Sequence, residues 1–174
     1  MPTDKPANAP IHLIVGPVGA GKSTYGIALA QRVGGVRLTL DEWMTRLFRP
    51  DRPETDVMPW YVERAARCVD QIWSVASGLH AAQTPVVLEI GMIRRADREG
   101  LYGRVDALGA PFEMHVVDAP RAVRRQRVAQ RNAERGDTFS MVVPPEFFEL
   151  ASDLWEPVLE DECGGRDVRF VLTE

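Results

Sequence analysis

Lysine is nearly absent from this 174-residue chain, because Lys5 and Lys22 are the only two lysines among its 21 basic residues. Cysteine is equally scarce. Cys68 and Cys163 lack the spacing of metal ligands, so the sequence predicts no disulfide framework, and Cys68 is expected to be a buried free thiol. The longest apolar runs reach only the length of a strand, which excludes a transmembrane helix.

The chain also lacks an excess of positive charge. Its formal net charge of −4 and pI near 5.5 differ from the basic balance of a general nucleic-acid binder. His12, His80 and His115 show no mutual spacing, so neither a histidine metal site nor a histidine nucleophile is supported. Residues 1–10 carry three prolines and no apolar core, which predicts a flexible tail rather than a signal peptide and makes the cytoplasm the default location.

Apolar, β-rich runs alternate with segments of helical spacing along the rest of the chain. The predicted strands are residues 11–15, 36–40, 85–90, 112–117 and 168–172. The predicted helices are residues 22–33, 41–48, 60–79, 94–108, 118–134 (with Asp118 as its cap) and 145–154. This alternation indicates one α/β domain over residues 11–174 with a mainly parallel five-stranded sheet, whose ligands bind beyond the carboxyl ends of the strands.

The strongest signal is a complete G-x-x-x-x-G-K-[ST] pattern between the first predicted strand and the first predicted helix. In such a loop, glycines allow the peptide N–H groups to point inward, and the helix N-terminus favours a polyphosphate. Lys22 is expected to reach the β- and γ-phosphates of ATP, and the Ser23 hydroxyl is expected to bind Mg²⁺. The expected nucleotide-binding residues are Gly16, Gly19, Ala20, Gly21, Lys22, Ser23 and Thr24.

Asp41 follows the second predicted strand directly. If that strand ends beside the phosphate loop, this carboxylate can accept a proton from an acceptor hydroxyl as the hydroxyl oxygen attacks the γ-phosphate. The alternative is a helix N-cap, because a helix-like segment follows, and the two roles can coexist.

GPVGAGKST, followed about twenty residues later by LDEWM, resembles the P-loop small-kinase group. This group includes chloramphenicol phosphotransferase, phage polynucleotide 5′-hydroxyl kinase, gluconate kinase-like enzymes and zeta toxins, and such chains are often called AAA family ATPases. The resemblance implies a three-layer P-loop NTPase fold, with Asp41 matching the catalytic base of the first two members. The polynucleotide kinase pattern has an arginine three residues after this Asp, where the present chain has Met44, and Arg46 is not equivalent.

Four arginines share one face of the helix predicted over residues 118–134. Arg124, Arg127, Arg131 and Arg135 fall within an arc of roughly 80° on a helical wheel. In the resembled kinases, a helix and loop at this place form a lid whose arginines contact the transferring phosphate, so we expect a lid over about residues 124–144. Arg127 and Arg131 are the expected catalytic members, and the alternative is a solvated charged face.

Glu89 ends the third predicted strand, where P-loop proteins usually place an acid that holds Mg²⁺ or its water. Asp is the commoner residue there. Asp118 after the fourth strand competes for the role, although the Ala-Pro that follows it in the sequence favours a helix cap. Ser23 and Glu89 are thus the expected metal-linked residues. Trp60 and Tyr61, beyond a proline-rich loop, are more typical of core than of an acceptor pocket.

Together these features predict an ATP-dependent kinase that phosphorylates a hydroxyl of a small-molecule acceptor. A polynucleotide 5′-hydroxyl kinase is disfavoured by the acidic charge and by Met44. A partner-driven P-loop ATPase without an acceptor stays open as a third alternative. The sequence gives no oligomeric state.

Overall fold

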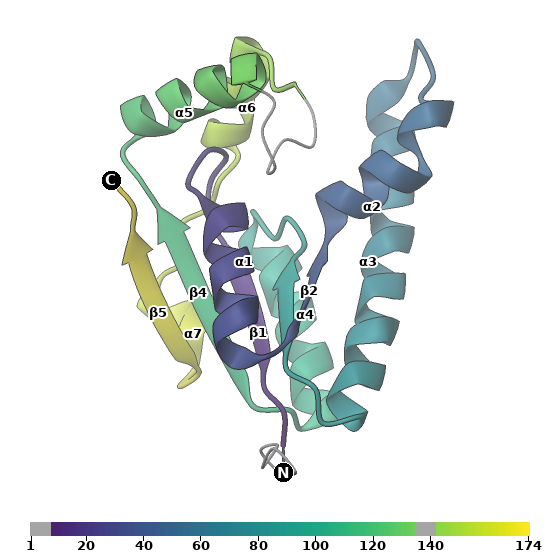
Figure 1. The fold of residues 1–174 in the computed structure, drawn as a ribbon, viewed down its shortest axis with the longest axis vertical. Helices are drawn as coiled ribbons and strands as arrows, with labels where there is room; N and C mark the ends of the chain where they lie inside the picture. The colour runs from purple at the N-terminus through teal and green to yellow at the C-terminus, as the bar shows by residue number, and fades with distance from the viewer. Residues whose placement is uncertain (1–7, 135–141) are drawn as a thin grey trace.

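The computed structural model describes residues 8–134 and 142–174, and these residues form an α/β domain around one five-stranded parallel sheet (Figure 1). In chain order the strands are β1 (Ile11–Val15), β2 (Val36–Thr39), β3 (Val86–Glu89), β4 (Phe112–Asp118) and β5 (Asp167–Leu172). Their order across the sheet is β2-β3-β1-β4-β5, and every neighbouring pair is parallel.

The helices lie on both faces of this sheet and at its carboxyl end (Figure 1). They are α1 (Lys22–Val33), α2 (Leu40–Leu47), the 3₁₀ turn η1 (Arg49–Asp51), α3 (Val57–Ala81), α4 (Arg95–Leu108), α5 (Arg121–Glu134), α6 (Pro145–Asp153) and α7 (Glu160–Cys163). None of the helices in residues 8–134 and 142–174 is long and apolar enough to cross a membrane.

Alternation along β1 divides the core between the two faces of the sheet. Ile11, Leu13 and Val15 face the larger cluster, which includes residues of α3 and α4, whereas Ile14 faces the cluster under α1. All five residues of β1 are buried, as expected for a central parallel strand covered on both faces. The three-layer architecture predicted from the sequence is therefore confirmed.

Residues 8–10 belong to this packed domain, although the sequence assigned them to a flexible tail. Ala9 is fully buried, and its carbonyl oxygen lies 2.7 Å from Nδ1 of His80. The carbonyl oxygen of Pro10 accepts a hydrogen bond from the amide of Val86, so the segment extends the β1 side of the sheet. The remainder of the predicted tail, residues 1–7, lies outside the described residues.

The strand order brings three carboxyl ends together at one edge. β3 lies between β1 and β2, so the loop after β1, Glu89 at the end of β3 and the start of α2 after β2 are neighbours. In Figure 1, α5 and α6 lie at this same end of the sheet. Ligand sites in parallel sheets form at such a switch point, where the chain leaves neighbouring strands in opposite directions.

Candidate active site

The loop after β1 adopts a conformation that only glycine allows at two positions. Gly16 has a φ of 149°, and a Cβ there would lie 1.9 Å from the carbonyl oxygen of Val117 on β4. Gly19 has a φ of 80°, and a Cβ there would lie 2.7 Å from the carbonyl oxygen of Arg124. The loop is therefore pressed between β4 and α5, which leaves its backbone facing the N-terminus of α1.

Lys22 folds back over this loop. Its ammonium group donates hydrogen bonds to the carbonyl oxygens of Gly16 (2.9 Å) and Pro17 (2.8 Å), at the place where a polyphosphate is expected. Burial lowers the pKa of this ammonium group, while the charges of Glu89 and Asp41 act in the opposite direction. The two carbonyls are weak replacements for an anion, so the arrangement fits a phosphate that would draw Lys22 away from its own loop.

Ser23 and Glu89 meet directly, as expected for two residues that share a metal. The Ser23 hydroxyl donates to Oε1 of Glu89 over 2.7 Å. The other oxygen of Glu89 accepts two hydrogen bonds from the guanidinium of Arg37, at 2.8 and 3.2 Å. The chemistry of this set, a hydroxyl and a carboxylate at a helix N-terminus, suits the hard oxygen coordination that Mg²⁺ prefers. Thr24, the last predicted loop residue, is exposed.

Asp41 lies in the first turn of α2 and does not cap it. Thr39 is the N-cap, and its hydroxyl oxygen accepts a hydrogen bond from the amide of Glu42 at 3.2 Å. The capping role weighed for Asp41 is therefore wrong, because β2 ends one residue earlier than predicted and the helix begins at Leu40. The carboxylate of Asp41 is left free of backbone partners among the described residues.

The pKa of Asp41 is raised above its ordinary value. The protein atoms that crowd the carboxylate are the main cause, and the negative charge of Glu89 adds to it, whereas Lys22 opposes the shift. The side chain still meets solvent, because it lies at the wall of an open cleft. A carboxylate that holds a proton more readily than usual, and that faces a cleft, is suited to proton transfer.

A polar cleft of about 180 Å³ connects these groups. Its walls come from α1, β2, α2, the end of β3 and α5, and carry both acids and bases. The lining residues are Ser23, Ile27, Arg37, Thr39, Asp41, Glu42, Thr45, Arg46, Glu89 and Arg131. Three of the predicted site residues in separate elements, Ser23, Asp41 and Glu89, thus line one space, together with one of the predicted arginines.

The arginines of α5 divide into different environments. Arg124 is 7% exposed and donates to the carbonyl oxygens of Ala119 (2.9 Å) and Val18 (3.2 Å), so it fastens the phosphate loop to α5. Arg127 lies outside the cleft and donates to the hydroxyl of Thr173 at 2.7 Å and to the carbonyl oxygen of Glu174. Thr173 in turn donates to the carbonyl oxygen of Ala20 over 2.9 Å, which joins the end of β5 to the loop.

Arg131 is the member of the set that reaches the cleft. Within residues 8–134 and 142–174, its buried Nε has no hydrogen-bond partner. The pKa of Arg131 is lowered, because burial outweighs the opposing effect of the negative charge on nearby Asp41. A buried guanidinium nitrogen without an acceptor costs free energy, so the cleft fits an anionic group beside Arg131. Arg135 lies outside the described residues.

The predicted lid segment, residues 124–144, is described only in part, because residues 135–141 fall outside the described chain. Asn132 joins the two described sides, since its side chain donates to the carbonyl oxygen of Val143 at 2.7 Å and accepts from its amide at 3.1 Å. Asn132 therefore ties α5 to the segment before α6.

Arg37 is a charged cleft residue, paired with Glu89, that the sequence analysis missed. Its signal was present, since Arg37 and Thr39 alternate with apolar residues on β2 and so share one face of the strand. Tyr61 contacts the large core cluster, and its pKa is raised to about 12 by burial and by the charge of Asp41. Asp118 is the last residue of β4 rather than a cap within α5, and its carboxylate accepts from the amide of Ala119 at 2.7 Å.

Two of the three histidines lie together despite their unrelated positions in the sequence. Nδ1 of His12 and Nε2 of His115 are 3.1 Å apart, next to Glu113. Strand pairing between β1 and β4 produces this contact, which the sequence analysis did not foresee. His80 lies apart and contacts Ala9.

Comparison with known proteins places the fold. A family model described as an AAA domain matches residues 11–143. A protein assigned as a kinase from Chloroflexus aurantiacus is similar, with a TM-score of 0.74 and 17% identity over 97% of this chain and 87% of that one. A gluconokinase from Sinorhizobium meliloti has a TM-score of 0.57 and 20% identity over 95% and 82% of the two chains.

The Pnkp1/Rnl/Hen1 RNA repair complex is also similar, with a TM-score of 0.60 and 19% identity over 87% of this chain and 45% of that one. We found no curated protein with significant sequence similarity to this chain. The family match covers most of the chain and begins at β1, and the structural neighbours share the phosphate-loop architecture. The chain belongs to the AAA domain family, and its fold is that of the P-loop small kinases.

Proposed function

We propose that this protein is an ATP-dependent kinase that transfers the γ-phosphoryl group to a hydroxyl of a small polar acceptor. The observation that carries the proposal is the cleft in which Asp41, Arg131 and the Ser23–Glu89 pair face one another beside the phosphate loop. Asp41 comes from a different element than the phosphate loop, and its raised pKa suits a base that accepts the proton of a hydroxyl.

In this mechanism, the residues of the loop and α1 hold the nucleotide. Lys22 exchanges its two carbonyl partners for the β- and γ-phosphates, and the Ser23 hydroxyl, which is paired with Glu89 in the structure, would hold Mg²⁺. Mg²⁺, when bound there, neutralises charge on the β- and γ-phosphate oxygens. Glu89, oriented by its ion pair with Arg37, would hold the ion through its water.

Asp41 and Arg131 act on the transferred group. The carboxylate of Asp41 takes the proton of the acceptor hydroxyl as its oxygen bonds to the γ-phosphorus, while the bond from that phosphorus to the β-phosphate oxygen breaks and ADP leaves. Arg131 donates hydrogen bonds to the phosphoryl oxygens, a role supported by its position in the cleft wall and by its Nε, which has no partner among the described residues. Arg127, held by Thr173, supports the loop from outside the cleft.

The size of the cleft favours a small acceptor. Its volume of about 180 Å³ is below the roughly 300–1,000 Å³ of pockets that hold drug-sized ligands. Arginine and glutamate side chains line it, including Arg46 and Glu42, so a hydroxylated polar compound fits better than an apolar one. A 5′-hydroxyl oligonucleotide is the second candidate, because a polynucleotide repair complex is among the structural neighbours.

The test is ADP release measured against a panel of sugars, sugar acids, nucleosides, aminoglycoside-like antibiotics and a 5′-hydroxyl oligonucleotide. We expect one small hydroxylated acceptor to raise turnover at least tenfold, with the phosphate found on that compound and no turnover in Lys22→Ala. Phosphate on the oligonucleotide would select the second candidate. Turnover that no acceptor raises, but that a protein fraction does, would replace both with a partner-driven ATPase.

A further inference from the structure

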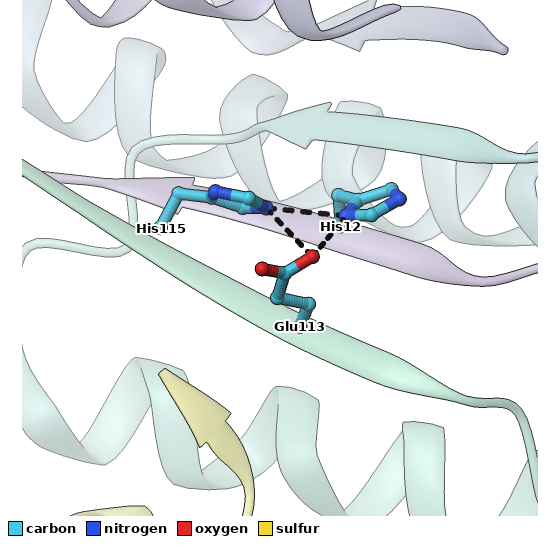
Figure 2. Close-up of side chains that lie close together, drawn as sticks. All are labelled: His12, Glu113 and His115. Atoms are coloured by element: carbon cyan, nitrogen blue, oxygen red, sulfur yellow. Dashed lines mark hydrogen bonds and ion pairs between the residues drawn. The ribbon is translucent and has the colours of Figure 1, made fainter. Parts of the chain in front are cut away.

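Three side chains outside the cleft converge on one point between the sheet and α1 (Figure 2). His12 comes from β1, and Glu113 and His115 come from β4. The two strands pair in parallel with His12 opposite Glu113, and His115 lies two residues further along the same face of β4. None of the three lines the cleft of the candidate active site.

The distances within this cluster match those of a metal site. Nδ1 of His12, Nε2 of His115 and Oε2 of Glu113 are separated by 3.1, 3.3 and 3.6 Å. Ligand atoms bound tetrahedrally at about 2.0–2.1 Å from an ion are about 3.3 Å from one another. The three atoms therefore form one face of such a tetrahedron, as Figure 2 shows by their convergence.

Two of the three side chains, His115 and Glu113, are oriented by contacts of their other polar atom, the one that faces away from the cluster. The Tyr25 hydroxyl on α1 lies 2.8 Å from Nδ1 of His115, so this nitrogen can donate its proton to the tyrosine oxygen and leave Nε2 with a lone pair. Nη2 of Arg169 lies 3.1 Å from Oε1 of Glu113, which leaves Oε2 to the cluster. Outer contacts of this kind fix the tautomer and the ring plane of metal-binding histidines.

Hydrogen bonding within the cluster does not satisfy its atoms. Burial lowers the pKa of both histidines, that of His115 to about 4, so the rings are neutral near pH 7. Among the described residues, Nε2 of His12 is buried without a partner. If His12 carries its proton on Nε2, its Nδ1 lone pair points at the lone pairs of His115 and Glu113, an arrangement that a cation relieves.

We propose that His12, Glu113 and His115 bind a divalent transition-metal ion, with Zn²⁺ as the best match, at a site separate from the Mg²⁺ position of the cleft. Two imidazoles and one carboxylate are typical zinc ligands, whereas Mg²⁺ prefers oxygen ligands and water. The Glu113 side chain is 27% exposed, against 6% and 1% for the histidines, so the ion enters from the Glu113 side and a water completes its coordination there.

Such an ion would join β1, the strand that leads into the phosphate loop, to β4. His12 precedes Gly16 by four residues on β1, and Tyr25 holds the site to α1. The expected role is structural, since both histidines are buried and the site lies outside the cleft that holds the catalytic candidates. Binding to the folded chain alone raises its stability by mass action.

The test uses the full chain, stripped with a chelator and kept free of nucleotide. Zn²⁺ is titrated in competition with a chromophoric indicator, and Co²⁺ is added to record the visible bands of a four-coordinate ion. We expect one equivalent with a Kd below about 1 µM, and a melting temperature higher by roughly 5 °C with Zn²⁺ in excess. Glu113→Gln should weaken binding at least tenfold, and His12→Gln should abolish it.

His80→Gln is the matched control, because His80 is also a buried histidine but lies outside the cluster and contacts Ala9. It should keep the full affinity. Glu113→Gln decides the question if His12→Gln fails to fold, because the Glu113 side chain is partly exposed. A Kd weaker than about 100 µM, or an affinity equal in Glu113→Gln and the native chain, would overturn the proposal and identify an adventitious ion only.

Discussion

The two acids of the cleft differ in how firmly each is held. Glu89 accepts hydrogen bonds from Ser23 and Arg37 with both of its oxygens, and this pairing fixes the orientation of the carboxylate. Asp41 has no such partner among the described residues, and crowding raises its pKa. Their environments therefore separate the roles of a metal-linked carboxylate and a proton acceptor.

Asp41→Asn should lower the rate of acceptor phosphorylation by about 10²–10⁴-fold, because the amide cannot accept the hydroxyl proton. The variant should fold with unchanged or slightly higher stability, because the surrounding protein atoms disfavour the charged form of the native carboxylate. The gain stays below about 1 kcal/mol because solvent in the cleft screens the charge. Asp70→Asn, on the exposed face of α3, is the control. Native turnover in Asp41→Asn would show that Asp41 is not the base.

The pH dependence of kcat/KM should show an acidic limb well above the ordinary range of an aspartate. Activity needs ionised Asp41, and the raised pKa means that the proton leaves only at higher pH. The native state also binds this proton more tightly than the unfolded state, so the contribution of Asp41 to stability falls as pH rises between the two pKa values. A profile flat down to pH 4, measured with a substrate that does not titrate, would contradict the assignment.

Arg131 and Arg127 should respond differently to substitution. Arg131→Ala should reduce kcat by about 10²–10³-fold with little loss of stability, because its guanidinium faces the cleft. Arg127→Ala should lower the melting temperature and change kcat less than tenfold, because it loses contacts with Thr173 and Glu174. Steady-state kinetics beside thermal unfolding of both variants distinguish the two. A larger kcat loss in Arg127→Ala would show that it enters the cleft during turnover.

At the scale of the element, the sequence predicted the type and order of the helices and strands well and their boundaries less well. Every predicted strand and helix is present, because each carries a periodic apolar pattern of sufficient length. α3 begins at Val57 rather than residue 60, since Pro59 is tolerated in the first turn of a helix. α7 was missed because four residues, three of them acidic, carry no periodicity.

What fixes α7 is a buried ion pair that joins distant parts of the chain. Nε of Arg98 on α4 donates to Oε1 of Glu162 at 2.5 Å, and both side chains are fully buried. Arg98 also donates to the carbonyl oxygens of Met92 and Ile93, and Tyr102 donates to Glu162 at 2.8 Å. The sequence separation of 64 between the two partners explains why no local pattern predicts the pair.

Arg98→Met should lower the free energy of unfolding by about 3–5 kcal/mol, because it leaves Glu162 as an uncompensated buried charge. The double variant Arg98→Met, Glu162→Leu should recover much of that loss, since both charges are then gone. Urea denaturation of the single and double variants provides the measurement. Arg104→Met, which breaks an exposed pair with Asp70, should cost less than about 1 kcal/mol. A loss in Arg98→Met no larger than this control would refute the argument.

At the scale of the whole molecule, a site was easier to predict from the sequence when its residues are contiguous in the chain. The phosphate loop was predicted because its motif is local and flanked by a strand and a helix. Asp41 and Glu89 were expected at the same edge because both follow or end strands of a parallel sheet, and both line the cleft. The helical wheel placed four arginines on one face but could not separate Arg127 from Arg131, because α5 turns that face toward several neighbours.

The His12, Glu113 and His115 cluster depends on something that no single-strand pattern contains. It forms only because β1 and β4, about 100 residues apart, pair in one register. A shift of that register by one residue would move Glu113 and His115 to the opposite face of the sheet relative to His12. The identity of strand neighbours is therefore the information that the sequence analysis lacked.

Bound nucleotide should stabilise the whole domain, and this stabilisation should require Mg²⁺. At ATP and Mg²⁺ concentrations 100 times the Kd, the gain is about 2.7 kcal/mol, which raises the melting temperature by roughly 5–10 °C. Chelation of Mg²⁺ should remove most of this shift, because Ser23 and Glu89 then have no ion to hold. Thermal unfolding with and without chelator provides the measurement. Lys22→Ala serves as the control, and an equal shift in that variant would place the nucleotide elsewhere.

The scarcity of lysine has a consequence for handling the protein. Amine-directed reagents find two lysine side chains, Lys5 and Lys22, and only the second lies in the described structure. Burial lowers the pKa of Lys22, so a larger fraction of it is the unprotonated nucleophile at neutral pH. Acylating dyes, crosslinkers and amine-coupled sensor surfaces would therefore consume Lys22, the proposed phosphate-binding group. Coupling through a terminal tag or through Cys163 preserves it, and nucleotide bound during labelling shields it.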